Sequence, residues 1–275
     1  MLGYGYYGGR ILPLDEIKIP LCDRSYFFGD AVYEVCIGRG KKIYRFSEHR
    51  DRLLNSLSGV KMNLPKDFSE LENIAAELID KASFPFFTLY IQIGRVCEER
   101  DHAFSTTDKS SMLLALFPGS APALTEISLS TEEDKRYSYC SFKTVNLLPA
   151  VLSSARAKEI GVEETVYHRG GRVVECSHSS ILIYKNEKLI TPPPCPFVLP
   201  GITAKTLMTL AEGDGLSVEW DFFSLEDLFS ADEVFVTSTT RLVRRARKID
   251  GLAVGGRYPE LSHRLWELIY EDFNK

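Results

Sequence analysis

Residues 86–93 read FFTLYIQI, and this stretch decides the class of fold. Within it, side chains that can face water alternate with aliphatic ones, which is the period of a strand with one face in the core. Residues 112–117, MLLALF, predict a second strand that pairs nearby. Residues 31–37 and 42–44, separated by the turn GRG at 38–40, predict a hairpin.

Two amphipathic helices are expected to pack on this sheet. Ser47 and Glu48 supply the start of the first helix, and Ser69 with Glu72 form a capping box for the second. Both carry apolar side chains at helical spacing. These are Phe46, Leu53, Leu54, Leu57 and Val60 in the first helix and Leu71, Ile74, Ala75, Leu78 and Ile79 in the second.

A break in both patterns divides the chain. Residues 118–122, PGSAP, cannot continue a regular ladder. We therefore predict a small N-terminal α/β domain over residues 1–118, an interdomain linker over 119–124 and a larger domain over 125–275. In the larger domain we expect strands at 125–130, 140–144, 165–168, 180–184, 188–191, 233–236 and 242–249, and helices at 150–160, 203–211 and 259–273. Because this order lacks a strict βαβ rhythm, it favours a two-domain α+β fold with a pseudo-barrel over a doubly wound sheet.

Composition and charge exclude several classes of protein. The chain is 44% hydrophobic and 26% charged, as in ordinary globular proteins. The 33 Lys and Arg against 38 Asp and Glu give a net charge of −5, which removes the positive field of a general nucleic-acid or anionic-membrane binder. The apolar runs are far shorter than the roughly 20 residues that span a bilayer. A small-molecule ligand is therefore favoured.

The cysteines and the first residues bear on compartment. The six cysteines show neither a CxxC pair nor a Cys/His spacing suited to zinc, so no metal site is expected. They are Cys22, Cys36, Cys97, Cys140, Cys176 and Cys195. The chain opens without a charged and then apolar signal segment. We therefore expect reduced thiols and a cytoplasmic protein.

Four local features could carry chemistry. Lys143 lies in a predicted strand among apolar or small neighbours, where a lysine either reaches solvent along its stem or is held in a pocket. Glu175, beside small hydroxyl residues, is either a surface carboxylate or part of a site. Residues 199–203, LPGIT, lead into a helix whose first N–H groups can receive a phosphate. Residues 237–240, TSTT, could hold the same phosphate or simply form a turn.

Together these features meet the requirements of one cofactor. Lys143 supplies an amine for a Schiff base, and Glu175 supplies a carboxylate for a pyridinium nitrogen. The two loops offer anion nests, with Arg52 as a counter-charge. Pyridoxal 5'-phosphate requires all of these groups.

Five ordered motifs resemble those of the class IV (fold type IV) pyridoxal-phosphate-dependent aminotransferases, and they span nearly the whole chain. They are DRSYFFGDAVYE at 23–34, EHRDRL at 48–53, KTVNLL at 143–148, LPGIT at 199–203 and VTSTT at 236–240. The resemblance implies that the larger domain binds the cofactor, that Lys143 holds it and moves the substrate proton, and that Glu175 keeps the pyridine nitrogen protonated. It implies further cofactor contacts from Arg52, Leu199, Gly201, Ile202, Thr203, Ser238 and Thr239.

The sequence RDHAF from Arg100 onward resembles the Arg-x-His motif of D-amino-acid transaminases. There Arg100 and His102, with Tyr33 and Thr240, would bind the substrate, since a guanidinium offers a planar fork to the α-carboxylate. The side on which the carboxylate lies decides which Cα hydrogen faces Lys143. The resemblance therefore implies transamination between a D-amino acid, of the D-alanine or D-glutamate class, and a 2-oxo acid by a ping-pong mechanism.

Other functions stay open at this point. A branched-chain L-amino-acid aminotransferase or an aminodeoxychorismate lyase would share the fold, and the motif Arg100-x-His102 speaks against both. A regulatory protein without turnover would not need the set Lys143, Glu175 and Arg52. The resemblance also implies a homodimer in which the loop of Arg100 and His102 reaches the neighbouring chain's cofactor.

Three features of the sequence depart from the family pattern, and one of them is Pro200, which stands where other residues are often seen. Cys176 and Ser180 stand where the family usually has a glycine and an asparagine, so the hydrogen bonds around Glu175 are expected to differ. Residues 241–248 are unusually basic. We expect a solvated strand face there, with a pocket for an acidic side chain that includes Arg244 as the alternative.

Overall fold

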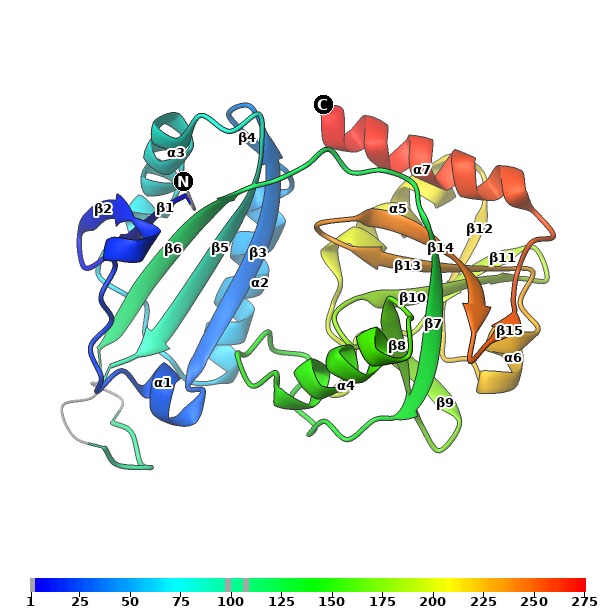
Figure 1. The fold of residues 1–275 in the computed structure, drawn as a ribbon, viewed down its shortest axis with the longest axis horizontal. Coiled ribbons are helices and arrows are strands. Elements are labelled where there is room, and N and C mark those ends of the chain that lie inside the picture. Colours follow the sequence, from blue (N-terminus) through cyan, green and yellow to red (C-terminus); the bar gives the residue numbers. More distant parts are fainter. Residues whose placement is uncertain (1–2, 97–99, 106–108) are drawn as a thin grey trace. The chain divides into compact units, whose positions relative to one another are not determined.

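The computed structural model describes residues 3–96, 100–105 and 109–275, and the chain forms two compact units (Figure 1). Unit 1 consists of Met1–Ala121 and Phe142–Asn146, and unit 2 consists of Pro122–Ser141 and Leu147–Lys275. The segment with Lys143 thus belongs to the first unit, although it lies past the expected linker.

Unit 1 is built on an antiparallel sheet of six strands in the order β2-β1-β6-β5-β3-β4 (Figure 1). These are β1 (Tyr4–Tyr7), β2 (Arg10–Pro13), β3 (Ala31–Arg39), β4 (Lys42–Ile43), β5 (Phe86–Arg95) and β6 (Ser110–Pro118). The alternation in β5 is confirmed, because Phe87, Leu89, Ile91 and Ile93 are buried. The expected pairing with β6 and the hairpin of β3 and β4 are confirmed as well.

Two longer helices, α2 (Phe46–Gly59) and α3 (Leu71–Ala82), pack on this sheet in one apolar cluster, as expected. Short helical turns lie at η1 (Leu14–Glu16), α1 (Arg24–Phe28) and η2 (Phe68–Glu70). The predicted capping box is wrong, because Ser69 lies inside η2 and no side chain caps α3. The 3-10 turn takes the place of a side-chain cap at this helix start.

The predicted strand at residues 140–144 is also wrong, since only an isolated bridge between Thr144 and Val32 forms there. Tertiary contacts hold this segment instead. The ring of Phe142 packs so closely on Gly59 that a Cβ at that glycine would lie 2.3 Å from it. The Asn146 side chain donates to the Gly29 carbonyl at 2.9 Å. These contacts override the strand propensity of the sequence.

Unit 2 contains a mixed sheet of nine strands in the order β12-β11-β10-β13-β14-β7-β8-β9, with β15 beside β14 (Figure 1). The β7–β14, β7–β8 and β11–β12 pairs are parallel and the others are antiparallel. The strands are β7 (Glu126–Glu133), β8 (Glu164–Arg169), β9 (Arg172–Cys176), β10 (Ser180–Lys185), β11 (Lys188–Thr191), β12 (Ser217–Trp220), β13 (Glu233–Ser238), β14 (Leu242–Ile249) and β15 (Leu252–Ala253).

The helices of unit 2 are α4 (Leu148–Glu159), α5 (Ile202–Gly213), α6 (Leu225–Phe229) and α7 (Pro259–Asn274). The three long ones agree with the predicted ranges. The α+β class is confirmed, and so is the preference over a doubly wound sheet. The elements that the sequence did not indicate, such as β12, β15 and α6, are too short to show a period.

The basic stretch at residues 241–248 is not a solvated face along its whole length. Arg244 and Arg245 lie on β14 between β13 and β7 and are 9% and 6% exposed. Arg244 pairs with Glu164 at 3.2 Å, and Arg245 makes two bonds of 2.7 Å with Glu233. Residues 242–246 of β14 are buried, whereas Arg247 and Lys248 are exposed. The Arg244 guanidinium already has a carboxylate partner within the protein.

No helix in the described part of the chain is long and apolar enough to cross a membrane. The same residues contain no group of three or more His, Cys, Asp or Glu arranged to hold a metal ion. Five cysteines of the described residues form no disulfide, and Cys97 lies outside those residues. The five are Cys22, Cys36, Cys140, Cys176 and Cys195.

Candidate active site

In unit 1, the structure brings Lys143 and Tyr33 together. The Lys143 Nζ lies 3.3 Å from the Tyr33 hydroxyl and 4.3 Å from the centre of its ring. The main chain of Lys143 is held on both sides, because its N–H donates to Ser56 Oγ at 3.1 Å and its carbonyl accepts from Tyr33 N–H at 2.9 Å. The ring of Tyr33 stacks on Tyr90 at 5.6 Å. The amine is therefore fixed beside a phenol.

Arg52 of α2 lies in a buried charge cluster of the same unit. Its Nε and Nη2 donate to the two oxygens of Glu34 at 2.6 and 2.8 Å, and His49 Nδ1 lies 2.7 Å from the same carboxylate. Glu34 is fully buried. Burial by itself would raise its pKa, but the hydrogen bonds and charge of Arg52, with His49, outweigh this and lower the pKa to about 2. Glu34 thus fixes the guanidinium.

The residue pattern of β3 indicates Glu34, which the motif at residues 23–34 does not single out by itself. Glu34 falls in the phase of β3 that buries Val32 and Cys36, so it is a charged residue at a core-facing position. Such a residue requires a buried partner. Arg52 and His49, three residues apart on one helix face, provide it.

The loop at residues 100–105 also belongs to unit 1. The guanidinium of Arg100 lies 4.9 Å from the centre of the Phe28 ring, and the ring of His102 lies 5.0 Å from it. The two expected carboxylate ligands therefore share one aromatic support. The residues that flank this loop, 97–99 and 106–108, lie outside the described part.

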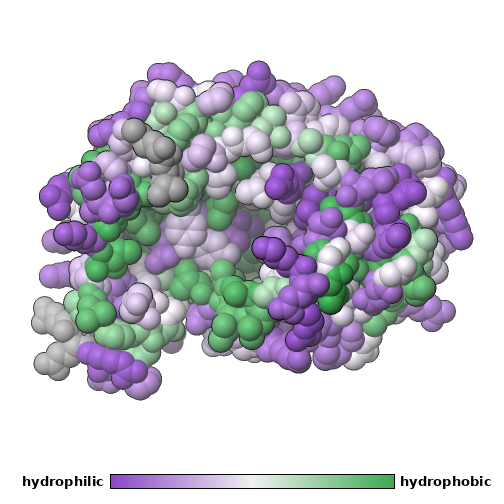
Figure 2. Space-filling model, viewed as in Figure 1, coloured by the Kyte–Doolittle hydropathy of each residue, from purple (hydrophilic) through white to green (hydrophobic). Residues whose placement is uncertain are grey.

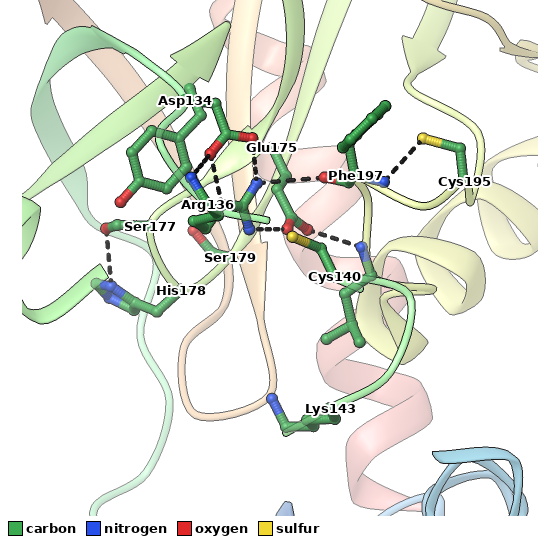
Figure 3. Close-up of polar contacts among 12 residues, drawn as sticks. Asp134, Arg136, Cys140, Lys143, Glu175, Ser177, His178, Ser179, Cys195 and Phe197 are labelled. Atoms are coloured by element: carbon green, nitrogen blue, oxygen red, sulfur yellow. Dashed lines mark hydrogen bonds and ion pairs between the residues drawn. The ribbon is translucent and has the colours of Figure 1, made fainter. Parts of the chain in front are cut away.

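In unit 2, Glu175 lies on β9 and is only 6% exposed, so it is not a surface carboxylate (Figure 3). One carboxylate oxygen accepts from Arg136 Nη1, and the other accepts from the Leu199 N–H at 3.0 Å. Arg136 also donates two bonds to Asp134, at 2.9 and 3.0 Å, and one to the Phe197 carbonyl at 3.2 Å. Each oxygen of Glu175 is thus positioned by one donor.

Burial and charge oppose each other at Glu175. Burial raises the pKa of its carboxyl, while the charge and hydrogen bonds of Arg136 lower it, and the net direction is upward. Arg136 lies 4.6 Å from the centre of the Tyr167 ring, which leaves its guanidinium plane little freedom. The sequence did not indicate Arg136 or Asp134, because residues 132–139 are polar and show no period.

The N-terminus of α5 forms the second part of the site in unit 2. Gly201 is the N-cap residue, no side chain caps the helix, and Ile202 and Thr203 are buried. A Cβ on Gly201 would lie 2.4 Å from Ser180 Oγ, so the glycine lets the Ser180 side chain lie close to the main chain at the start of α5. Ser180 pairs across the sheet with Thr237, whose buried Oγ1 has no partner among the described residues.

The TSTT segment lies where β13 ends. Thr237 and Ser238 close the strand and Thr239 follows, half-buried, in the turn to β14, while Thr240 is exposed. Leu199 is half-buried beside Glu175. The helix start and these hydroxyls supply uncharged donors, which is the set that receives a phosphate at a helix N-terminus.

The fold and these residues define a class of enzyme. The family model for class IV amino-transferases matches residues 31–249. This chain therefore belongs to the class IV aminotransferases, and it is an aminotransferase of fold type IV.

Individual relatives show what the chain is similar to. It is 30% identical over 275 residues to the D-alanine aminotransferase of Staphylococcus haemolyticus, covering 98% of this chain and 96% of that protein. It is 31% identical over 256 residues to the D-alanine aminotransferase of Bacillus licheniformis, covering 92% and 90%.

Solved structures confirm the fold. The branched-chain amino acid aminotransferase of Escherichia coli superposes with a TM-score of 0.90 at 22% identity, covering 99% of this chain and 95% of that one. The branched-chain aminotransferase of the archaeon Thermoproteus uzoniensis, solved with norvaline, has a TM-score of 0.88 at 22% identity and covers 100% and 96%. A further branched-chain amino acid aminotransferase, solved with pyridoxamine 5'-phosphate, has a TM-score of 0.88 at 20% identity and covers 99% and 94%.

Proposed function

We propose that this chain binds pyridoxal 5'-phosphate and transfers an amino group between a D-amino acid and a 2-oxo acid in two half-reactions. The observation that carries the choice of a D-amino acid is the motif Arg100-x-His102 in a chain 30% identical, over nearly its whole length, to D-alanine aminotransferases. D-Alanine and D-glutamate are the first substrates to test.

The residues of unit 2 fit the cofactor. The close approach of Gly201 to Ser180 and the unpartnered hydroxyl of Thr237 leave donors at the start of α5 for a phosphate. We assign the phosphate to Ile202, Thr203, Ser238 and Thr239 with Arg52, the ring to Leu199, and the pyridine nitrogen to Glu175. When bound, the cofactor withdraws electrons from the substrate Cα so that its hydrogen can leave as a proton.

Each remaining residue has a task that its surroundings support. The Lys143 amine is held beside Tyr33 and is the base that takes the Cα proton and returns it. Arg100 and His102, with Tyr33 and Thr240, hold the substrate carboxylate and so choose which hydrogen faces Lys143. Arg136 opposes the effect of burial on the pKa of Glu175 and orients its carboxylate for the pyridine nitrogen.

We infer that the working form is a homodimer with shared sites. Exposed apolar side chains support this inference, because large apolar patches are uncommon on a monomer and a second chain would cover them. On α4, Leu148, Val151 and Leu152 are 57–68% exposed, and Figure 2 shows hydrophobic atoms over the first turns of this helix.

The proposal is tested by half-reactions. The cofactor-loaded protein is mixed separately with D-alanine, D-glutamate, L-leucine and L-glutamate, and the cofactor absorbance is followed as it converts to the aminated form. We expect conversion with a D-amino acid at a rate far above that with either L-amino acid. The matched control is Lys143→Ala, which should bind cofactor without this conversion. Fastest conversion by L-leucine would overturn the choice of a D-amino acid.

A further inference from the structure

We propose that Arg24 and Phe28, both on α1, are positioning residues that set the conformation of the loop at residues 100–105. This inference rests on the proposed role of Arg100 and His102 in binding the substrate carboxylate. Through the loop, the two α1 residues would determine the affinity for substrate and the preference between D- and L-amino acids.

Arg24 holds the main chain of the loop. Its side chain is 4% exposed, and its guanidinium donates to three successive carbonyls. Nη1 bonds to the carbonyl of Asp101 and reaches that of Ala103 at 3.4 Å, and Nη2 bonds to the carbonyl of His102 at 3.1 Å. A guanidinium has five N–H groups in a rigid fork, so one side chain can fix three peptide groups.

A second arginine anchors the same arrangement. Arg24 Nε donates to Asp30 Oδ2 at 2.7 Å, and Arg95 Nε donates to the same oxygen at 3.0 Å. Arg95, 1% exposed, also donates to the carbonyls of Val60 and Lys61 at 3.0 and 3.1 Å. Arg24 is therefore itself held in place by buried groups.

Phe28 holds the side chains of the loop. Its ring centre lies 4.7 Å from the guanidinium carbon of Arg24, 4.9 Å from that of Arg100 and 5.0 Å from the ring of His102. Arg24 and Phe28 are four residues apart on α1 and so share one side of the helix. One short helix thus fixes both the loop's main chain and the direction of its two functional side chains.

The physical need for this support follows from the loop itself. Residues 100–105 form no helix or strand, so no regular hydrogen-bond ladder fixes their dihedral angles. A carboxylate site works only when its donors are held close to the productive geometry. Without Arg24 the carbonyls of residues 101–103 would have to find other donors, and the loop would sample several conformations.

The experiment compares three variants in the cofactor-loaded enzyme. Arg24→Lys keeps the charge near Asp30, but the three N–H groups of one ammonium cannot reach Asp30 and three carbonyls at the same time. Phe28→Leu keeps apolar volume and removes the ring. Arg10→Lys, at an exposed arginine on β2, is the matched control for the same substitution. Hydrogen exchange of the peptide covering residues 100–105 reports the loop, and steady-state kinetics with D- and L-amino acids report recognition.

We expect exchange in the loop to rise at least fivefold in Arg24→Lys and to stay unchanged in Arg10→Lys. KM for the amino acid should rise about tenfold or more, while kcat changes less than threefold and cofactor content stays the same. Phe28→Leu should lower the ratio of D to L activity. Unchanged exchange in Arg24→Lys and Phe28→Leu would overturn the positioning role even if the enzyme prefers other substrates. Raised exchange with unchanged KM would overturn the link to carboxylate recognition.

Discussion

At the scale of single residues, buried charges with built-in partners organise each group of functional side chains. Glu34 fixes Arg52 in unit 1, and Arg136 fixes Glu175 in unit 2. A charge taken out of water is stable only when a partner of opposite sign and good geometry accompanies it. Removing one partner should therefore affect both stability and the function of the other.

The first prediction concerns the stability contributed by Glu34. Its pKa is about 2 in the folded chain against 4.5 as the ordinary value, so its stabilisation is fully present above pH 4.5 and is lost as the pH falls toward 2. The shift corresponds to about 3 kcal/mol. We expect the free energy of unfolding of wild type to exceed that of Glu34→Gln at pH 7. This excess should shrink by about that amount as the pH falls from 4.5 toward 2, measured by urea unfolding.

A matched control is available on the surface of the same unit. Glu72→Gln removes the exposed ion pair with Arg50, in which the side chains are 62% and 41% exposed. Such pairs contribute about 0–1 kcal/mol. Parallel pH dependence of wild type and Glu34→Gln would contradict the assignment.

The second prediction concerns Arg136. Arg136→Met should leave Glu175 buried without its counter-charge, whereas Asp134 keeps Arg169 at 3.0 Å. The pKa of Glu175 should then rise further, so the acid limb of the rate profile should move to higher pH. The half-reaction rate should fall roughly 10- to 100-fold, as for other partners that orient a functional group. Arg136→Lys, which keeps the charge, should retain most of the profile. An unmoved acid limb in Arg136→Met would reject this role.

At the scale of elements, the end of α2 positions the segment that carries Lys143, the proposed base. Gly59 is the last residue of α2, and the Phe142 ring occupies the space where its side chain would be. Phe142 immediately precedes Lys143. The end of α2 therefore packs against the residue before Lys143 and holds this segment in place.

The third prediction tests this contact between Gly59 and Phe142. Gly59→Ala would place a Cβ 2.3 Å from the Phe142 ring and displace the segment, although alanine favours the helix by about 1 kcal/mol. We expect turnover to fall about tenfold while circular dichroism stays unchanged. Phe142→Leu in the same chain should restore part of the loss.

Gly213 supplies the control for this variant. It is the last residue of α5, and a Cβ there would meet nothing within 4 Å. Gly213→Ala should therefore leave turnover as in wild type. Equal activity of Gly59→Ala and Gly213→Ala would show that the close contact between Gly59 and Phe142 is not required for turnover.

At the scale of the whole molecule, the proposed shared site makes activity depend on two chains. In a dimer with twofold symmetry, each site would combine Lys143 of one chain with Arg100 of the other. Complementation between two inactive variants can detect this arrangement.

The fourth prediction is the outcome of that mixing. Lys143→Ala and Arg100→Ala are unfolded and refolded together in equal amounts, then assayed with D-alanine and 2-oxoglutarate. Half of the dimers would be mixed, each with one intact site, so roughly a quarter of wild-type activity should return. Refolding each variant alone is the control. Absence of recovery in mixtures shown to contain mixed dimers would reject the shared site.

The sequence by itself determined the elements with a clear period and the motifs that are contiguous. The alternation in β5, the apolar stripe of α3 and the segment LPGIT before α5 all depend on neighbours within a few residues. The family resemblance followed from such local motifs. The same local features indicate Lys143, Glu175 and Arg52 as functional candidates.

Only the tertiary structure decided which partners these residues have. Glu34 and Arg52 are 18 residues apart, Arg136 and Glu175 are 39 apart, and Arg24 lies 77 residues from Asp101. Tertiary packing also buries Arg244 and Arg245. It places Phe142–Asn146 in unit 1, although the sequence predicts a strand there. The physical reason is that a buried polar side chain is stabilised by a partner that the folded chain brings to it from a distant part of the sequence. The local period of a helix or strand carries no information about which residue that partner is.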